Sequence, residues 1–457
     1  MTSPAIPTVP LPRPLPTAAA PAVGVVRRLA AAGHQAYLVG GAVRDLLLDH
    51  EPGDFDVATS ASPEQILALF PLSRQAGAAF PVVLVVEQGS LVETATFRVE
   101  GPYSDARHPD SVDLTTSLPA DARRRDFTVN ALYLDPLAEV IVDPVGGAAD
   151  CAQRVLRCVG EPGQRFREDA LRLLRAPRLA AQCGLTIDSE TRAALASSRE
   201  GIRRIAAERV GQELARILTG PGPADALEEL AGSGLLAIIL PEVDAMRGVP
   251  QPPQFHPEGD VWIHTVLMFR HSPARSLSLG LAILLHDVAK PVTLTRTDRI
   301  RFHGHAARGA EMALAIGRRL RYAAADVART ADLVAQHLRF IEVRHMRPST
   351  LKRFLRQPDF AEHLELHRLD CLSSHRELGQ WDFCREALAE LSSEELAPPP
   401  LLRGADLLAF GYPPGPLLGR ILRELETAQL DGELPTRDAA EVWVRRRFPH
   451  RGDPAAR

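Results

Sequence analysis

The sequence contains almost no lysine. Lys290 and Lys352 are the only lysines among the 53 basic residues of this 457-residue chain. Nearly all of the positive charge therefore lies on guanidinium groups, which bind phosphates and bases through two parallel hydrogen bonds. A GC-rich genome would produce the same arginine bias, so the bias alone predicts no function. The formal net charge of −4 argues against a protein that coats nucleic acid through bulk electrostatics.

Cysteine is also scarce, and long apolar runs are missing. The five cysteines form neither a CxxC pair nor a zinc-ligand spacing, which argues against a disulfide framework and favours a reducing compartment. No apolar run has the length of a membrane span. Residues 1–23 are rich in proline and lack the charged start and apolar core of a signal peptide, so we predict a disordered tail. The expected location is the cytoplasm, without membrane contact.

The rest of the chain divides into a mixed α+β part and a mostly helical part. QAYLV and PVVLVV have the composition of buried strands, and LVETATF follows the second across a Gly-Ser turn, which predicts a hairpin. In SPEQILALF, Ser62 fits an N-cap, Pro63 the first helical position and Gln65 a capping box. Helical periodicity dominates beyond about residue 165, interrupted by proline-rich breaks. We predict a head over 24–160, a helical neck over 161–245, a histidine-rich helical domain over 246–380 and a helical tail over 381–457.

Two closely spaced aspartates, Asp54 and Asp56, are the first candidate site. On an extended strand, residues i and i+2 face the same way, and two adjacent carboxylates suit Mg²⁺ ions that catalyse phosphoryl transfer. The preceding VGGAVRD fits a strand, a glycine turn that a triphosphate can approach, and Arg44 at a helix start. The Walker lysine loop and the GxGxxG motif are both absent, so ordinary P-loop and dinucleotide sites are excluded. The alternative is a solvated pair of aspartates in a loop.

Four further segments follow in order: LVETATFR, YSDARHP, RRRDFTVNALYLDP and REDALRLLRAPRLAAQCGLTID. Together with the glycine turn and the aspartate pair, they resemble the class II tRNA nucleotidyltransferase and poly(A) polymerase family over about residues 24–450. The resemblance implies a polymerase-β-like nucleotidyltransferase head followed by an all-α neck, body and tail. It implies that two aspartates hold catalytic Mg²⁺ and that Glu93 is a third carboxylate. The residues that it implies for nucleotide binding in the head are Gly41, Arg44, Arg125, Asp126 and Asn130.

The segment EDALRLLRAPRL suggests how a protein could select a base without a template. Asp169, Arg172 and Arg175 recur every three residues, which places them along one side of a predicted helix. A guanidinium donor beside a carboxylate acceptor complements the edge of cytosine or adenine, where a ring-nitrogen acceptor lies next to an amine. Uracil and guanine present the opposite order and should be rejected. The resemblance implies base reading by Asp169 and Arg172, with Arg175 and Arg178 near the triphosphate.

Fifteen histidines include a second group of candidate ligands. The order of these residues, with an adjacent His-Asp pair inside an apolar helix, resembles an HD-type metal phosphohydrolase domain. Imidazole and carboxylate ligands suit Mn²⁺, Ni²⁺ or Co²⁺ better than Mg²⁺ alone. Such a site can hydrolyse phosphomonoesters or cyclic phosphates, or survive as an inactive scaffold. The candidate ligands are His264, His286, Asp287, His305, His337 and Asp370, with His303 close in sequence.

These observations lead to a specific functional hypothesis with alternatives. The leading one is Mg²⁺-dependent, template-independent addition of C and A from CTP and ATP to the 3′ end of tRNA, with the C-terminal tail contacting the tRNA by analogy. Enzymes that add only CC or only A, and a poly(A) polymerase, are alternatives within the class. An HD metal phosphohydrolase whose head only binds RNA is the alternative from another class. The sequence leaves the oligomeric state open.

Overall fold

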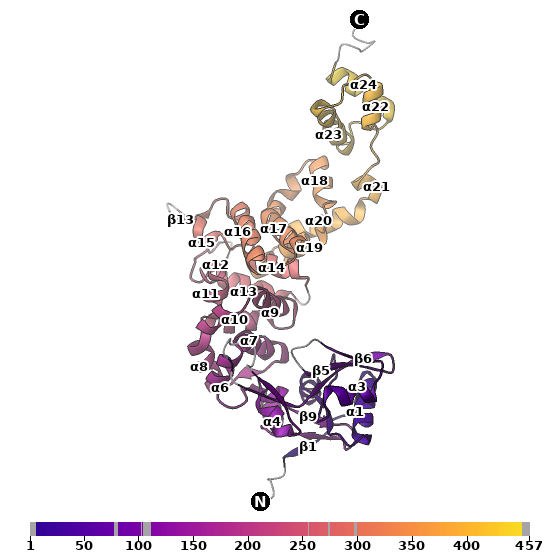
Figure 1. The fold of residues 1–457 in the computed structure, drawn as a ribbon. Helices are drawn as coiled ribbons and strands as arrows, with labels where there is room; N and C mark the ends of the chain where they lie inside the picture. Colours follow the sequence, from indigo (N-terminus) through magenta and orange to yellow (C-terminus); the bar gives the residue numbers. More distant parts are fainter. Residues whose placement is uncertain are drawn as a thin grey trace, which may run out of the picture. The chain divides into compact units, whose positions relative to one another are not determined.

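The computed structural model describes residues 6–76, 81–101, 103, 111–254, 256–272, 275–296 and 299–449. Two compact units make up the chain (Figure 1). The first contains the residues up to Arg247 together with Ser272–Gly280 and Ala315–Asp326, and the second contains Gly248–His271, Leu281–Leu314 and the residues from Val327 onward. Most of the predicted YSDARHP motif lies outside the described residues. The five-part division of the chain stays a prediction.

The head is built on an eight-stranded sheet in the order β1-β10-β9-β2-β3-β6-β5-β4. All its pairs are antiparallel except β3 with β6, which run parallel. The predicted strand QAYLV and the predicted hairpin, now β5 and β6, are both confirmed. The strands are β1 Thr8–Pro10, β2 Ala36–Val39, β3 Asp56–Thr59, β4 Arg74–Gln75, β5 Val82–Glu87, β6 Ser90–Thr96, β9 Tyr133–Asp135 and β10 Val140–Val142; β7 Arg98–Glu100 and β8 Val112–Leu114 form a separate ribbon.

Helices α1 (Ala20–Ala31) and α3 (Pro63–Leu69) contact each other and pack on this sheet (Figure 1). The capping box of α3 is confirmed: Ser62 Oγ accepts from Gln65 N, and Ser62 N donates to Gln65 Oε1. The shorter helices of the head are α2 Gly41–Leu47, α4 Leu118–Arg123 and α5 Gly147–Gln153.

The prediction of a disordered tail over residues 1–23 is wrong for the residues that the structure describes. Thr8–Pro10 forms edge strand β1, which pairs with Val140–Val142, and α1 already begins at Ala20. Proline is compatible with an edge strand because one side of such a strand needs no N–H donors. Residues 1–5 lie outside the described part.

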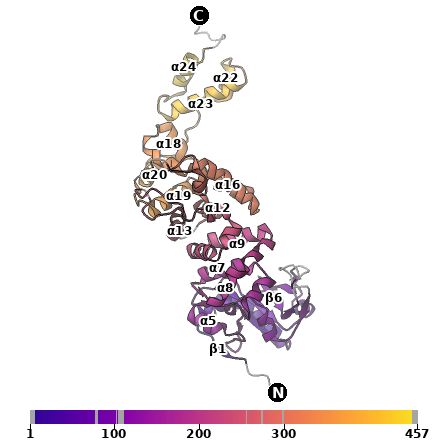
Figure 2. The same ribbon diagram turned by 90° about the vertical axis from the view of Figure 1, so that its left-hand side faces the viewer.

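The neck is helical, as predicted. α7 contacts both α9 and α10, and α7 and α9 are visible in Figure 2. Pro177 lies inside α7, and Val155–Leu156 and Thr186–Ile187 form a short parallel pair that periodicity did not predict. The helices are α6 Pro162–Glu168, α7 Arg172–Cys183, α8 Ser189–Ser198, α9 Ala207–Thr219, α10 Pro223–Gly232, α11 Leu235–Ile239 and α12 Pro241–Asp244.

The remaining chain is also mostly helical, so the predicted fold class is confirmed. A small hairpin, β13 Leu294–Arg296 with β14 Ile300–Phe302, interrupts the helices. The helices are α13 Val261–His271, α14 Leu277–Leu285, α15 Lys290–Thr293, α16 His305–Arg319, α17 Ala324–Gln336, α18 Pro348–Leu355, α19 Phe360–Ser373, α20 Gly379–Glu390, α21 Ser393–Leu396, α22 Gly404–Ala409, α23 Pro416–Leu430 and α24 Arg437–Arg447.

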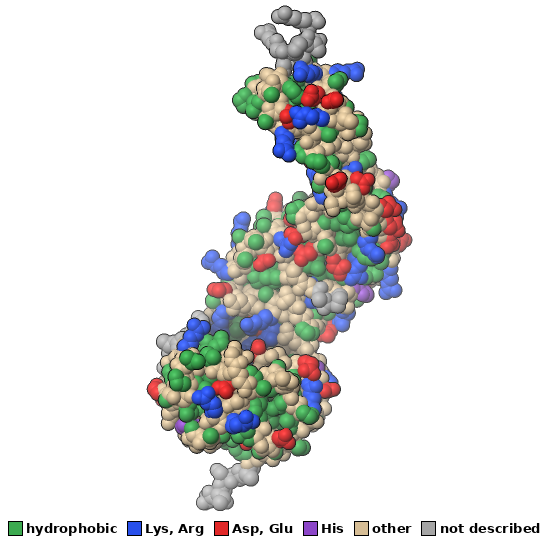
Figure 3. Space-filling model, turned by 90° about the vertical axis from the view of Figure 1, so that its right-hand side faces the viewer, with side chains coloured by type: hydrophobic (Ala, Val, Ile, Leu, Met, Phe, Trp, Pro, Cys, Tyr) green, Lys and Arg blue, Asp and Glu red, His purple; other side chains and the backbone are tan. Residues whose placement is uncertain are grey.

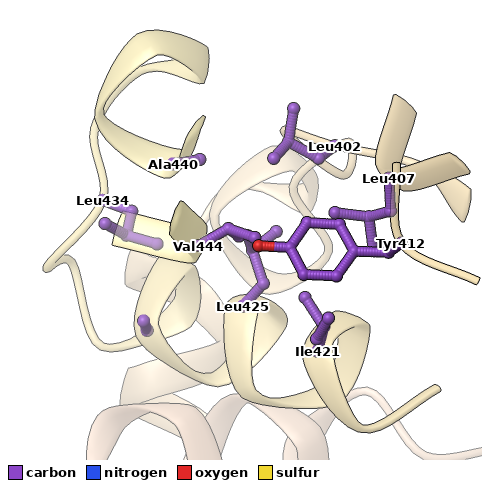
Figure 4. Packing of buried hydrophobic residues seen from close by; sticks show 9 residues of the cluster. Leu402, Leu407, Tyr412, Ile421, Leu425, Leu434, Ala440 and Val444 are labelled. Carbon is purple, nitrogen blue, oxygen red and sulfur yellow. The ribbon is translucent and has the colours of Figure 1, made fainter. Parts of the chain in front are cut away.

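The C-terminal helices α22 to α24 surround a small core of their own (Figure 4). Tyr412 is its largest side chain and packs among Leu407, Ile421 and Leu425, while its hydroxyl donates to Phe448 O at 2.8 Å. Figure 3 shows arginine and acidic side chains close together on the surface of this tail. No helix in the described ranges is long and apolar enough to cross a membrane.

Candidate active site

One cavity of about 880 Å³ in the first unit brings the predicted catalytic and nucleotide-binding residues together. Every residue that the sequence assigned to the nucleotidyltransferase site lines it: Asp54, Asp56, Glu93, Gly41, Arg44, Arg125, Asp126, Asn130, Asp169, Arg172, Arg175 and Arg178. Gly40, from the predicted glycine turn, lines it as well. Sequence reasoning missed further lining residues, including Arg98, Glu100, Tyr103, Arg124, Arg209 and Arg216. The large number of guanidinium groups makes the cavity suitable for a polyanion.

The three carboxylates meet because of the way the sheet is ordered. β3 begins at Asp56, and its parallel pairing sets Val57 opposite Thr94, so Asp56 lies beside Glu93. Asp54 precedes the strand instead of lying on it, which corrects the predicted extended D-x-D, although both aspartates line the cavity. Burial, together with the nearby charges of Glu93 and Asp54, raises the pKa of Asp56 to about 6. Like charges held this close favour a divalent cation between them.

Burial of the Asp56 carboxylate and the repulsion around it predict that Asp56→Asn stabilises the metal-free protein. The folded pKa of about 6 exceeds the ordinary value of 3.8, so stability falls as pH rises from about 4 to about 6 and the loss is complete at neutral pH. A shift of this size corresponds to about 3 kcal/mol, which solvent screening reduces to roughly 1–2 kcal/mol. We expect urea unfolding with EDTA to show that gain at pH 7.5 and little difference near pH 3.5. An unchanged or lower stability at pH 7.5 would contradict it.

A glycine turn between β2 and α2 forms part of the cavity wall. Gly40 has a φ of +73°, a backbone conformation that disfavours any residue with a Cβ. A Cβ on Gly41 would lie 3.4 Å from Arg44 Nη2, so the turn and the arginine are closely packed. Arg44 is buried, and its Nη1 donates to Asn130 Oδ1 at 2.7 Å. The turn therefore exposes backbone to the cavity beside a fixed guanidinium.

A buried carboxylate, Asp121, holds the arginines that follow α4. It accepts hydrogen bonds from Arg124 Nη2 at 2.7 Å, Arg125 Nη2 at 3.1 Å and the Tyr133 hydroxyl at 2.6 Å. Arg125 Nε also donates to the Tyr133 hydroxyl at 3.0 Å. These bonds fix the plane of the Arg125 guanidinium at the cavity wall. Sequence reasoning did not single out Asp121, whose spacing of four residues from Arg125 was the available signal.

The predicted base-reading pair lies in the cavity, but not on one helix. α6 ends at Glu168, Asp169 has extended dihedral angles, and α7 begins at Arg172. The carboxylate of Asp169 accepts from Leu171 N at 3.0 Å, which competes with continued helix formation. Arg172 is buried and donates to Glu168 Oε2 and to two backbone carbonyls. The single stripe predicted from Asp169 to Arg175 is therefore wrong, although the side chains share one cavity.

Two further ion pairs hold the arginines of α7. Arg175 Nη2 lies 2.6 Å from Asp126 Oδ2, and Arg178 Nε donates to Glu213 Oε2 at 2.7 Å. Glu213 is buried in α9. The structure thus ties α7 to the head and to α9 through the same side chains that line the cavity.

A second cluster lies in the other unit and contains the predicted histidine ligands. His264, His286 and Asp287 form one group whose possible ligand atoms lie within 4.8 Å of one another, and Asp287, His305 and His337 form another. Asp370 Oδ1 lies 3.2 Å from His264 Nε2. His303 is exposed and is in none of these groups. All six predicted ligands are therefore brought together, on helices α13, α16 and α19 and beside α14 and α17.

The chemistry of this cluster fits a metal ion. The ring nitrogens His264 Nε2 and His286 Nε2 are buried without a hydrogen-bond partner among the described residues. His305 Nε2 and His337 Nε2 face each other at 3.3 Å, and burial lowers the pKa of His337 to about 4, so its ring is neutral. Lys290 Nζ lies 2.7 Å from Asp287 Oδ2. Unpartnered nitrogens that converge on buried carboxylates are the ligands that Mn²⁺, Ni²⁺ or Co²⁺ prefer.

Two residues of this cluster were missed by sequence reasoning. His256 and Glu258 lie in the proline-rich break before α13, and they form a third group of possible ligands with His264. Both belong to the segment QFHPEGD, one of the proline-rich breaks in the helical periodicity. A histidine and a glutamate separated by one residue were the available signal.

Models of three known families match ranges of the chain that contain residues of both sites. Residues 36–157 match the family "Poly A polymerase head domain", residues 184–247 match "Probable RNA and SrmB- binding site of polymerase A", and residues 260–371 match "HD domain". The first match contains the carboxylate cluster, and the third contains all six predicted metal ligands of the histidine cluster.

Curated relatives align with about half of the chain. A protein named CCA-adding enzyme from Geobacillus thermodenitrificans is 44% identical over 214 residues, which is 47% of this chain and 53% of that protein. A protein of the same name from Levilactobacillus brevis is 45% identical over 211 residues, 46% of this chain and 53% of that protein. The chain thus spans about half the length of the curated relatives it matches.

Solved structures resemble the chain over nearly its whole length. The crystal structure of the Bacillus stearothermophilus CCA-adding enzyme in complex with CTP has a TM-score of 0.71 and 28% identity, and covers 95% of this chain and 98% of that one. The Thermotoga maritima CCA-adding enzyme complexed with tRNA has a TM-score of 0.62, with coverage of 96% and 98%, and at 18% identity it shows likeness of fold alone. The head, RNA-binding and HD regions follow one another in this order along the chain, which is the order expected for the class II tRNA nucleotidyltransferase and poly(A) polymerase family that the sequence resembles.

Proposed function

We propose that the protein adds C and A from CTP and ATP to the 3′ end of tRNA without a nucleic-acid template, with Mg²⁺ as cofactor. The observation that carries this proposal is the single cavity lined by Asp54, Asp56 and Glu93 and by the pair Asp169 and Arg172. The three carboxylates suit phosphoryl transfer, and the pair of Asp169 and Arg172 suits the selection of a base. The similarity to proteins named CCA-adding enzyme supports tRNA as the acceptor.

In this proposal, the carboxylate cluster holds the divalent ions. Asp54, Asp56 and Glu93 would bind Mg²⁺, which activates the attacking 3′ hydroxyl and stabilises the leaving pyrophosphate when bound. The family implies a divalent ion, and oxygen ligands favour Mg²⁺ over softer metals. The guanidinium groups of Arg44, Arg125 and Arg178 would neutralise the triphosphate, and the Gly40 turn would let it approach the backbone.

The remaining residues would select the nucleotide. Asp169 can accept from the exocyclic amine of cytosine or adenine, while Arg172 donates to the adjacent ring nitrogen. Glu168 and two carbonyls already orient the Arg172 guanidinium, so little side-chain entropy is lost when a base binds. Uracil and guanine would place a ring N–H donor opposite the Arg172 donor and a carbonyl acceptor opposite the Asp169 acceptor. Both bases would therefore be rejected.

A set of three tRNA transcripts tests the proposal against its alternatives. Transcripts that end before CCA, after C and after CC are incubated with Mg²⁺ and with CTP, ATP or both. We expect all three to be completed to CCA when both nucleotides are present. Addition of only C or only A would show a split pathway with a partner enzyme, and long A tails would show a poly(A) polymerase. No addition to any transcript would overturn the proposal.

A second candidate function is supported by the histidine cluster. Its buried, unpartnered nitrogens and carboxylates would hold Mn²⁺, Ni²⁺ or Co²⁺. The metal would supply an activated water when bound, and the substrate class would be phosphomonoesters or cyclic phosphates. His264, His286 and Asp370 would bind the ion, and Asp287 would be shared with His305 and His337. Such an activity would be independent of nucleotide addition. A cytoplasmic location stays a prediction for both activities.

A further inference from the structure

Nine arginines line the cavity of the candidate active site. In eight of them, a guanidinium nitrogen lies between 2.6 and 3.1 Å from a carboxylate oxygen of the protein. A guanidinium group in such a pair is fixed in direction and its charge is partly balanced before any substrate binds. The paired arginines are Arg44, Arg98, Arg124, Arg125, Arg172, Arg175, Arg178 and Arg216.

The ninth arginine, Arg209 of α9, differs from the others. None of the carboxylates that the structure describes forms an ion pair with it. Its Nη1 is buried and has no hydrogen-bond partner among the described residues. A buried donor without an acceptor is unfavourable, and in native proteins such a group calls for a functional explanation. Arg209 is therefore the cavity arginine whose charge the protein itself does not use.

Close packing of α9 fixes the backbone that carries Arg209. A Cβ on Gly211 would lie 2.4 Å from Leu320 O, in the segment after α16, and the Tyr322 hydroxyl donates to Gly211 O at 2.9 Å. Glu213 ties the same helix to an arginine of α7. The backbone at Arg209 is thus in place before a substrate enters, which lowers the entropy cost of binding.

The charges on this side of the cavity leave an excess of positive charge. Arg209 lies on the same face of α9 as Glu213 and Arg216, which follow it by four and seven residues. The single carboxylate of Glu213 binds both Arg178 and Arg216. Arg209 adds a third guanidinium group without adding a carboxylate. This part of the wall therefore suits an anion.

We propose that Arg209 binds a phosphate group of a substrate in this cavity. The inference rests on the proposed function, which brings two kinds of phosphate here: the triphosphate of CTP or ATP, and the backbone phosphates at the 3′ end of the RNA. Phosphate oxygens supply the acceptors that this guanidinium group lacks, and its planar shape lets it bind two of them at once. No carboxylate of the described protein competes for it.

Equilibrium binding to the full-length protein tests this role, with Arg209→Met as the variant. Methionine keeps a long apolar side chain and removes the guanidinium group. The Kd of CTP with Mg²⁺ and the Kd of a tRNA that ends before CCA are measured separately. We expect one of these Kd values to rise by about 10- to 100-fold, the effect of losing one or two charge-assisted hydrogen bonds. The melting temperature should be unchanged or higher, because no described carboxylate loses a partner.

The two substrates distinguish the two sources of phosphate. A loss confined to CTP would assign the contact to the triphosphate. A loss confined to tRNA, with a slope of log Kd against log salt concentration that is lower by about one, would assign it to the RNA backbone. Arg203→Met is the matched control, because it removes an arginine that is 62% exposed and outside the cavity. Both Kd values should stay the same in this control.

Several results would overturn the inference. These are unchanged affinity of Arg209→Met for both substrates, an equal loss in Arg203→Met, or a lower melting temperature of Arg209→Met. A similar loss for both substrates would indicate a general change in the cavity and would also overturn it. A wild-type protein that binds both substrates but adds no nucleotide would remove the proposed function, while the Kd values of Arg209→Met would still decide the inference. A wild-type protein that binds neither would remove both.

Discussion

The double variant Asp54→Asn and Asp56→Asn should reduce nucleotide addition by about 10³-fold or more. The two amides keep the shape of the carboxylates but remove the charge that would bind divalent ions. Such ions contribute several kcal/mol to phosphoryl transfer, and about 4 kcal/mol corresponds to a factor of 10³ in rate. Single-turnover incorporation from CTP into a tRNA that ends before CCA measures the loss directly, because product release does not limit that rate.

The controls separate a chemical defect from a folding defect. Asp49→Asn removes a carboxylate from the same segment, but that side chain is 90% exposed and outside the cavity, so addition should be unchanged. Because burial and the nearby negative charges raise the pKa of Asp56 to about 6, the double variant should be at least as stable as the wild type. Hydrolysis of a phosphomonoester or cyclic phosphate by the histidine cluster, if present in the wild type, should persist. Addition within tenfold of the wild-type rate would remove the carboxylate assignment.

The carboxylate cluster illustrates what the sequence can and cannot predict. The spacing of Asp54 and Asp56 was visible because it is local. The adjacency of Asp56 and Glu93 depends on the parallel pairing of β3 with β6 across the intervening helix and strands. No period in the sequence encodes that pairing, so only the resemblance to a family pointed to Glu93. The prediction of a disordered tail for the proline-rich N-terminal segment failed for a related reason. An edge strand such as β1 forms only when β10 is present beside it.

The base-reading pair and the histidine cluster show the same limit at the level of single side chains. Helical period alone predicted a continuous helix through Asp169, but its carboxylate binds a nearby backbone N–H and the helix ends at Glu168. Short polar side chains compete with the helix in this way, and period counting does not detect it. Glu258 was overlooked because it lies in a proline-rich break, whereas its contact with His264 depends on how that segment folds back onto α13.

Replacing Asp169 or Arg172 should have a larger effect on nucleotide selectivity than on the overall rate of nucleotide addition. In Asp169→Ala or Arg172→Ala, we expect the preference for CTP over UTP, taken as the ratio of kcat/KM values, to fall by about 100-fold. A 100-fold change corresponds to about 2.7 kcal/mol. This is the size expected when the variant no longer sets an acceptor against an acceptor, or a donor against a donor, of the uracil base. Incorporation of each of the four nucleotides into a tRNA ending before CCA provides the measurement.

The two variants differ in what else they disturb, and that difference makes the prediction sharper. Arg172→Ala also removes the guanidinium donor to Glu168 Oε2, Arg165 O and Arg124 O, so it should lose about 1–3 kcal/mol of stability. Asp169→Ala loses only its bond to Leu171 N, and a cap of this kind contributes about 1 kcal/mol. Arg167→Ala, on the exposed side of α6 at 70% exposure and outside the cavity, should leave selectivity and stability unchanged. If UTP and GTP are rejected as strongly by Asp169→Ala as by the wild type, base selection must lie elsewhere in the cavity.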